Sequence, residues 1–572
     1  MKNKKLLAAL ILAMVAILCF SNVSLVAVSA EAPATNSSVS VYDGTPDTTW
    51  FQKDVKEYTL TTAAQFAGLA TVCKNNGSLA GYTIRLGCDM VFNSGDASKW
   101  SASNKPTYSY TPISQFDGTL DGCGHIISGL FYGSNQGDVG LISKSAQGVI
   151  KNLGIVNSSF TTTGSRCGSL IGAGVEKSSG ITIENVYSDV LISANNQAGG
   201  IVGMGGKESN IKFTKCVFAG SATAAAIYSG GMLGEDGGAK AVFTDCINLG
   251  SIQAKTNRAG GMAGQLRVKG ETMTRCVNSG TVSGSISGAM VGRRAAAEMV
   301  VDRCVYIREY GEKLEGDVAG GSCTETNKAV YDLRQIKGQC LFEANGWVAM
   351  KDGCPMPSQT VADLAVKADI LRNGATKADE WGLSTLWGAS MRTASPSGLR
   401  FETRISKAAY NSLVETYGAD KVKMGTVIVP AVYVLEAESF TKASLEQLEK
   451  TGTKYLDVQA DKFFRETEND YVFSASVVEI LEENRELAFA AIGYIEINGE
   501  IHYSRTIAQR SVSEVAIAAL KDTATEQTAE YAYPMKVNGQ TVYSYLTPEE
   551  RTIINGFAVW GDDPYGAQIE WN

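Results

Sequence analysis

Residues 200–234 read GIVGMGGKESNIKFTKCVFAGSATAAAIYSGGMLG, a stretch that begins and ends with the same kind of tetrad. Each tetrad places two apolar residues between two small ones. Six copies occur: Gly140-Leu141-Ile142-Ser143, Ser169-Leu170-Ile171-Gly172, Gly200-Ile201-Val202-Gly203, Gly231-Met232-Leu233-Gly234, Gly261-Met262-Ala263-Gly264 and Ala289-Met290-Val291-Gly292. Their second residues are 29, 31, 31, 30 and 28 positions apart. A period near 30 residues indicates an internal structural repeat.

A second series of residues keeps the same period. It comprises Asn152, Asn185, Cys216, Cys246, Cys276 and Cys304. The copies hold short β-prone runs punctuated by Gly, Asn and Ser, and lack the long Ala-, Leu-, Glu- and Lys-rich stretches of helical repeats. A single copy cannot bury its apolar side chains, so successive copies must stack and pair equivalent strands about 4.8 Å apart. The repeat therefore predicts a right-handed parallel β-helix with coils of about 30 residues.

The cysteine series predicts a ladder of free, mostly buried thiols. Stacking holds equivalent Cβ atoms near the rung spacing, whereas a disulfide needs them within about 3.5–4.5 Å. The thiols would take the place that Asn152 and Asn185 occupy in earlier coils. Apolar residues lie three positions before and directly after each cysteine, so a corner or bulge is expected nearby. Disulfides are expected from the other cysteines, first Cys73 with Cys88, and then among Cys323, Cys340 and Cys354.

The tetrads resemble the Gly-Leu-aliphatic-Gly (GLUG) repeats of bacterial surface proteins, and the whole chain resembles such a surface protein of Gram-positive bacteria. The stretch Phe116-Asp117-Gly118-Thr119-Leu120-Asp121-Gly122-Cys123-Gly124-His125 is similar to the family's usual opening of the coil, and the resemblance covers about residues 40–355. It implies a scaffold or adhesive stalk. Some relatives join such repeats to zinc peptidases, but this chain has only His125 and His502 and no His-Glu-x-x-His motif, so that activity is not implied.

Glycine and charge divide the chain into two bodies. Of the 60 Gly, 34 lie at 112–292 and 13 at 361–572. The latter range carries 20 Lys plus Arg against 31 Asp plus Glu, whereas residues 31–360 hold 28 of each. We expect a signal peptide at 1–30, a lead-in at 31–57, the β-helix at 58–355, a linker at 356–380 and an acidic, β-rich domain at 381–572. The overall charge of -8 argues against nucleic acid as a partner.

The amino-terminal residues predict secretion. Lys2, Lys4 and Lys5 precede an apolar run from Leu6 to Phe20, and Val28-Ser29-Ala30 offers small residues for cleavage. A membrane anchor is disfavoured because polar residues interrupt the run before it could span a bilayer. The mature protein is therefore expected outside the cell or at its surface, with no membrane span after cleavage.

The second body is expected to be a sandwich-like α+β domain. Residues 426–434, 471–480 and 487–497 predict strands, and Asn498-Gly499 predicts a hairpin turn. Capping boxes of Ser511 with Glu514 and of Thr547 with Glu550 predict helices. The stretch from Gly388 to Phe401 is similar to a domain of unknown function in extracellular proteins of Gram-positive bacteria.

Candidate chemistry is sparse. Asp117 and Asp121 could serve a glycosidase, which needs two carboxylates, and Asp117 with His125 could form an acid–base pair, but turn roles in the opening coil are favoured. We therefore assign no catalytic, cofactor-binding or metal-binding residues, and no cofactor. Asp562-Asp563 is interpreted as a solvated tail. Sugar could stack on Trp381, Trp387 and Trp560 in a pocket of the second body, although core packing is the commoner role.

The function predicted is that of a secreted or cell-surface structural or adhesive protein, in which a β-helix stalk presents a binding or assembly module. An extracellular polysaccharide or a host or cell-surface protein would be the partner. The alternative is a carbohydrate-active enzyme or carbohydrate-binding protein built on the β-helix. An enzyme should bring Asp, Glu, Arg or Tyr together on one face of the coils, and the sequence alone reveals no such stripe.

Overall fold

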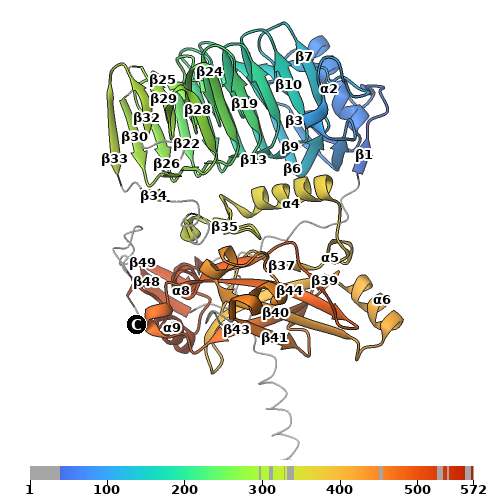
Figure 1. The fold of residues 1–572 in the computed structure, drawn as a ribbon, viewed down its shortest axis with the longest axis vertical. Coiled ribbons are helices and arrows are strands. Elements are labelled where there is room, and N and C mark those ends of the chain that lie inside the picture. The colour runs from blue at the N-terminus through green and yellow to red at the C-terminus, as the bar shows by residue number, and fades with distance from the viewer. Residues whose placement is uncertain are drawn as a thin grey trace, which may run out of the picture.

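The computed structural model describes residues 39–295, 298–307, 313–326, 329–331, 336, 341–449, 455–524, 533–537, 540–560 and 569–570. A parallel β-solenoid of about eight turns is followed by antiparallel sheets, which confirms the predicted fold class. Figure 1 shows the second body beside the solenoid, with helix α4 (Gln359–Asn373) between them. The second body thus lies along the side of the solenoid, not beyond its end. The expected signal peptide lies outside the described residues.

Three parallel sheets form the described solenoid. Sheet A contains β1 (Val39–Val41), β2 (Glu57–Leu60), β3 (Thr83–Leu86), β4 (Asp89–Val91), β6 (Thr119–Ser128), β9 (Val149–Val156), β13 (Ile181–Ser188), β17 (Asn210–Thr214), β18 (Val217–Phe218), β22 (Lys240–Thr244), β23 (Ile247–Asn248), β26 (Glu271–Thr274), β27 (Val277–Asn278), β30 (Glu298–Asp302), β31 (Val305–Ile307), β33 (Ser322–Thr326) and β34 (Ala329–Tyr331). Sheet B contains β5 (Ile113–Gln115), β8 (Ile142–Ser145), β12 (Ile171–Gly174), β16 (Val202–Met204), β21 (Leu233–Glu235), β25 (Ala263–Leu266), β29 (Val291–Arg294) and β32 (Glu315–Val318). Sheet C contains β7 (Phe131–Ser134), β10 (Ser159–Thr162), β11 (Arg166–Gly168), β14 (Leu191–Ala194), β15 (Gln197–Gly199), β19 (Ser221–Ala224), β20 (Tyr228–Gly230), β24 (Ser251–Gly260) and β28 (Thr281–Gly288).

One left-handed residue per coil makes the corner that the sequence predicts. Lys215 has a φ of 53°, between Phe213 and Cys216, which are both fully buried. The equivalent residues of other coils also have φ between 50° and 53°: Asn152, Asn185, Asp245, Arg275 and Arg303. The alternation of inward and outward side chains is interrupted at this residue. Phe213 and Cys216 can therefore both point into the core although they are three positions apart.

The asparagines and cysteines are not equivalent, so that part of the prediction is wrong. Thr214 pairs with Glu184, and Val217 pairs with Tyr187. Asn185 is therefore equivalent to Lys215, one position before Cys216. Asn tolerates the left-handed conformation better than most residues, which explains its presence at this corner in the early coils.

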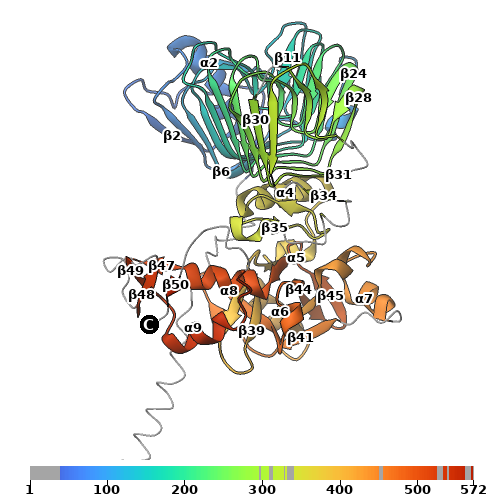
Figure 2. The same ribbon diagram turned by 90° about the vertical axis from the view of Figure 1, so that its left-hand side faces the viewer.

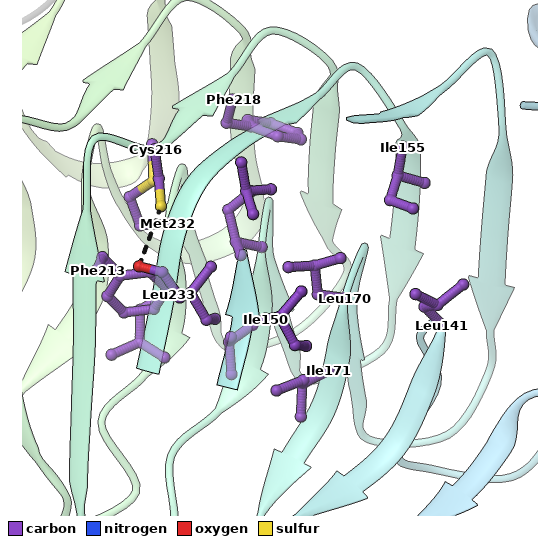
Figure 3. Packing of buried hydrophobic residues seen from close by; sticks show 14 of the residues in the cluster. Leu141, Ile150, Ile155, Leu170, Ile171, Phe213, Cys216, Phe218, Met232 and Leu233 are labelled. Carbon is purple, nitrogen blue, oxygen red and sulfur yellow. Dashed lines mark hydrogen bonds between the residues drawn. The ribbon is translucent and has the colours of Figure 1, made fainter. Parts of the chain in front are cut away.

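The predicted thiol ladder is present. Its four cysteines are free and buried, namely Cys216, Cys246, Cys276 and Cys304. Cys216 Sγ donates to the Ile183 carbonyl at 3.5 Å, within the apolar core of the coils (Figure 3). Cys73 and Cys88 are also free and buried, so the expected disulfide is not formed. Cys88 Sγ instead donates to the Thr61 carbonyl at 3.1 Å. Cys340 lies outside the described residues.

Glycine in the tetrads lets sheets B and C approach backbone to backbone. A Cβ atom on Gly203 would lie 2.6 Å from the Gly172 carbonyl oxygen and 2.8 Å from the Cys167 amide nitrogen. A Cβ atom on Gly264 would lie 2.8 Å from the Ser229 nitrogen. Real Cβ atoms are not found so close to backbone, so any larger residue here would push the two sheets apart. This close approach explains why small residues recur in each copy.

An apolar row on the outside of sheet A, here called the flank row, is covered by the segment that follows the solenoid. This segment, residues 341–373, is here called the linking segment and includes α4. The flank row consists of Ile126, Val156, Tyr187, Val217, Ile247, Val277 and Val305. All of these are buried against Trp347, β35 (Val348–Ala349), β36 (Pro355–Met356) and α4. Residues 346–357 therefore cover the side of the solenoid and not its end. The described coil strands run from β1 to β34, so they begin before residue 58 and end before residue 355.

The amino-terminal end of the solenoid carries helix α2 (Ala63–Asn76). Its side chains Phe66, Leu69 and Val72 are buried in the solenoid core. The helix packs against β5, the first strand of sheet B, and so covers an edge that would otherwise be open to pairing with another chain.

The second body is a sandwich of two antiparallel sheets. One contains β37 (Ser384–Thr385), β38 (Ser390–Arg392), β39 (Gly398–Ser406), β42 (Arg465–Glu466) and β43 (Asp470–Val478), and the other contains β40 (Val422–Pro430), β41 (Leu456–Ala460), β44 (Ala488–Ile497), β45 (Glu500–Tyr503) and β46 (Ala508–Ser511). A small third sheet contains β47 (Thr523–Ala524), β48 (Tyr533–Val537), β49 (Gln540–Ser544) and β50 (Ile569–Glu570). The helices are α5 (Lys377–Glu380), α6 (Lys407–Tyr417), α7 (Lys442–Glu449), α8 (Val512–Lys521) and α9 (Pro548–Asn555).

The predicted hairpin and helix starts of this body hold, but the strand predicted at 426–434 ends at Pro430, and Ala431–Leu435 form a 3-10 helix. The hairpin at Asn498-Gly499 joins β44 to β45, α8 begins after Ser511, and α9 begins after the capping box of Thr547 with Glu550. No helix in the described part of the chain is long and apolar enough to cross a membrane.

Candidate functional site

Asp117 and His125 do not form an acid–base pair. Asp117 accepts hydrogen bonds from the Ala146 amide at 2.6 Å and from Gln115 Nε2 at 2.7 Å. Asp121 accepts from the Cys123 amide at 2.9 Å and from Asn152 Nδ2 at 3.0 Å. Both aspartates therefore hold turns of the opening coils, as favoured from the sequence.

His125 belongs to the joint between the solenoid and α4. Its Nδ1 lies 3.0 Å from Asp89 Oδ1, and Lys367 Nζ of α4 lies 3.0 Å from the same oxygen. The Ile126 amide also donates to Asp89 at 3.0 Å. All three side chains are largely buried. A carboxylate that receives this many donors is a structural anchor rather than a free base.

The three tryptophans singled out from the sequence lie in different places. Trp387 is 2% exposed, and its Nε1 donates to Asp363 of α4 at 2.7 Å, so it is a core residue. Trp381 packs edge-on against His502 with 4.8 Å between ring centroids. Trp560 is 39% exposed and packs near Lys521 of α8. The structure does not bring them together into one pocket.

The structure reveals a polar stripe along the line where sheets B and C meet. Two columns of side chains, equivalent from coil to coil, make it. Sheet C contributes Gln197, Tyr228 and Arg258, and sheet B contributes Glu235, Gln265, Arg293 and Asp317. Strand register places the members of each column on successive rungs, about 4.8 Å apart. In Figure 1, strands β24, β25 and β29 lie in the upper part of the solenoid, whereas α4 and the second body lie below it.

Hydrogen bonds and ion pairs join the two columns. Gln197 Nε2 donates to Glu235 at 2.7 Å, and Arg293 Nη1 donates to Tyr228 Oη at 3.3 Å. Arg258 Nε donates to Asp317 Oδ2 at 2.7 Å. Each bond joins a side chain of sheet C to one of sheet B, so the side chains hold one another in place. Arrays of this kind offer several preorganised donors and acceptors to a ligand.

The two halves of the stripe carry opposite charge. Near Gln197, the carboxylates of Glu235 and Asp236 face the single guanidinium of Arg267. Near Tyr228, Arg258 and Arg293 share the single carboxylate of Asp317, with Arg293 Nε 3.5 Å from it.

Two carboxyl groups with strongly raised pKa values lie beneath the stripe. Glu271 occupies an inward position equivalent to Met299, where burial and then the charge of Asp236 raise its pKa to about 10. Burial likewise raises the pKa of Asp236 to about 6, against the effect of the Arg267 amide and guanidinium. Both residues are fully buried. A general acid must reach the oxygen that it protonates, and these two cannot reach a saccharide at the surface.

The stripe is not predicted in our sequence analysis, although the sequence contains a signal for it. Gln197, Tyr228 and Arg258 each lie three residues before the first glycine of a tetrad, and Glu235, Gln265 and Arg293 directly follow a tetrad. The residues of each column therefore occupy equivalent positions when the copies are aligned on their tetrads. No group of three or more possible metal ligands is present among the described residues.

The fold and the stripe together define a β-solenoid protein with a polar lateral face and a packed antiparallel second domain. No protein-family profile matches the chain, and no curated protein matches it. A crystal structure of a candidate immunoglobulin A1 protease from Bacteroides ovatus is similar at 18% sequence identity. The match covers 53% of this chain and 92% of that one, with a TM-score of 0.35.

Proposed function

We propose that this protein is a secreted or cell-surface interaction protein that binds its partner without chemical turnover. The solenoid is its rigid scaffold, and the polar stripe is its binding face. The observation that carries the proposal is the stripe itself, in which opposed side chains from successive coils are fixed by one another. The positive amino-terminal patch and apolar run support secretion, and the resemblance of the tetrads to GLUG repeats supports a surface location.

The scaffold role rests on how firmly the second body is joined to the solenoid. Trp347 of the linking segment donates to Asp245 at 3.0 Å on the solenoid side. On the other side, Arg505 pairs with Asp369 of α4, and Lys351 Nζ donates to the Ser504 carbonyl at 3.5 Å. Charged and apolar contacts on both faces of this segment favour one fixed arrangement over two loosely tethered domains.

The second candidate is a glycoside-cleaving enzyme on the same stripe, which brings Asp, Glu, Arg and Tyr together on one face of the coils as an enzyme should. Glu235 and Asp236 would be its paired carboxylates. The burial of Asp236 and Glu271 disfavours it, because the groups with raised pKa values are those least able to touch a substrate. Asp317, a more exposed carboxylate of the stripe, is already engaged in ion pairs with Arg258 and Arg293.

Binding and turnover can be separated in one experiment. The purified mature protein would be incubated with pectins, bacterial cell-wall polymers and host glycans, with binding measured by calorimetry and products by reducing-end release. We expect binding to at least one polymer with no new reducing ends. Product release that is abolished by E235Q would overturn the proposal in favour of the enzyme.

A further inference from the structure

We infer that the positive half of the stripe binds the carboxylate of an acidic polysaccharide, a sugar chain that contains uronic acid residues. This inference rests on the proposed binding function and names the class of its ligand. The starting observation is that Arg258 and Arg293 face one carboxylate, Asp317, and leave one positive charge without a counter-charge in that half of the stripe. The three side chains are 22%, 28% and 27% exposed, so a ligand can reach them.

The geometry favours a carboxylate at this place. A guanidinium offers its donors in a planar fork that matches the two oxygens of a carboxylate. Arg258 uses Nε toward Asp317, and Arg293 uses Nη1 toward Tyr228. Arg293 Nε is buried and lies 3.5 Å from Asp317 Oδ2, so a ligand would use the terminal nitrogens of the two guanidinium groups. The pair therefore has donor capacity beyond what Asp317 takes up.

The neighbouring groups favour a sugar as the carrier of that carboxylate. Gln265 lies between Glu235 and Arg293 in its column, is only 5% exposed, and its Oε1 has no hydrogen-bond partner in the described part of the chain. Tyr228 supplies a hydroxyl and Glu235 supplies acceptor oxygens, although the two residues are only 9% and 6% exposed and already accept from Arg293, Gln197 and Arg267. Neutral and acidic acceptors beside an arginine pair suit a ligand with hydroxyl groups on both sides of its carboxylate. A lone phosphate or sulfate would use the arginines alone.

The charge of the whole chain restricts where such a polymer can lie. Residues 361–572 carry a net charge of -11, whereas residues 31–360 are balanced. An anionic chain is repelled by the second body and is tolerated along the solenoid. The stripe lies on strands away from α4 and the second body (Figure 2), where this repulsion is weakest.

The test compares acidic and neutral ligands of equal length on the full mature protein. The probes are an oligogalacturonate, a hyaluronan oligosaccharide and a neutral galacto-oligosaccharide, titrated calorimetrically at low and high salt. The first two carry uronic acids of non-host and host origin, so they distinguish the sources. We expect an acidic probe to bind at low salt and to bind more weakly at high salt, because the contact is an ion pair near the surface.

Three variants make the inference specific. R293Q and R258Q are each expected to weaken binding of the acidic probe at least tenfold, because each removes a charge-assisted hydrogen bond. D317N removes the internal competitor and is expected to tighten binding. The matched control is R303Q, since Arg303 faces a single carboxylate, Asp302, elsewhere on the solenoid. Unchanged melting temperatures show that the variants are folded, and Y228F gives a milder change at the same place.

Each outcome decides one of the two claims. Equal binding of acidic and neutral probes, displacement by inorganic phosphate at equal concentration, or binding unaffected by R293Q, R258Q and Y228F would overturn the inference. The proposed function would survive those results. Cleavage of an acidic probe that binds in an Arg293-dependent manner would instead overturn the proposal of binding without turnover and leave the inference standing.

Discussion

Lys367 Nζ lies 3.0 Å from Asp89 Oδ1, and this ion pair joins two residues that are 278 positions apart in the sequence. Asp89 lies at the start of β4 in the solenoid, and Lys367 lies in α4. The contact holds the first coils against the segment that leads to the second body. Because both side chains are nearly buried, the pair is much less exposed to solvent screening than a surface ion pair.

Removal of the lysine should destabilise the protein. K367M removes the lysine from the buried Asp89 carboxylate, which His125 and the Ile126 amide still contact, so we expect a loss of about 3 kcal/mol in the free energy of unfolding. Urea denaturation measures this. The control is K377M, because the Lys377–Glu380 pair is exposed and should contribute little to stability. Equal effects of the two variants would contradict an anchoring role for Lys367.

The flank row predicts a second, more local effect. Ile247 is fully buried beneath the linking segment, so I247D places a charge where that segment packs. We expect the segment to detach and the chain to be cut near residues 341–373 by a dilute protease. Val300 also faces outward from sheet A but is 44% exposed, so V300D should leave the digestion pattern unchanged. A digestion-resistant I247D protein would mean that the cover does not depend on the row.

Glu271 makes stability depend on pH with a defined sign. Its carboxyl group has an ordinary pKa of 4.5, and its pKa in the folded protein is about 10. The folded state therefore keeps a proton that the unfolded chain releases, and stability falls as the pH rises from about 4.5 toward 10. E271Q removes this dependence and should stabilise the protein by about 3 kcal/mol at pH 7, with almost no gain at pH 4. The same gain at both pH values, measured by urea denaturation, would refute the assignment.

The thiol ladder should resist alkylation until the protein unfolds. Burial raises the pKa values of Cys246 and Cys304 well above the ordinary value, so these thiols are both shielded and protonated. Native alkylation should modify the exposed Cys123 and spare the ladder, whereas alkylation in denaturant should modify all four ladder cysteines. Peptide mapping without reductant gives the answer. A bond between any two ladder cysteines would show that the rungs are distorted.

Much of the solenoid can be predicted because its constraint is local and repeated. The tetrads around Gly203 and Gly264 mark a place where two sheets meet at backbone distance, and only small residues fit there. The register of the second series was harder to predict. Asn185 and Lys215 occupy the same left-handed position, but one residue favours that conformation and the other only tolerates it. The sequence pattern therefore aligned Asn185 with Cys216, whereas in the structure Asn185 is equivalent to Lys215.

The features missed from the sequence depend on contacts between distant segments. The aliphatic residue after each ladder cysteine, such as Val217, predicts a corner in the chain. Only the structure shows that the linking segment covers the row to which Val217 belongs. Trp387 was a candidate for sugar stacking, and its partner Asp363 lies in a segment that the sequence reading treats as a linker. The stripe is similar: Tyr228 and Arg293 are 65 residues apart and meet only because the coils stack.

The ion pairs of α4 also restrict how the repeat can change in length. Lys367 binds Asp89, and Arg372, five residues later, binds Asp189. The two aspartates are separated by three rungs of sheet A, about 14 Å, whereas five residues of helix advance about 7.5 Å and the long side chains supply the rest. A coil inserted between them would move one aspartate out of reach. Helix α4 therefore fixes the number of coils at this end, while coils beyond Val217 can be added or lost without disturbing either pair.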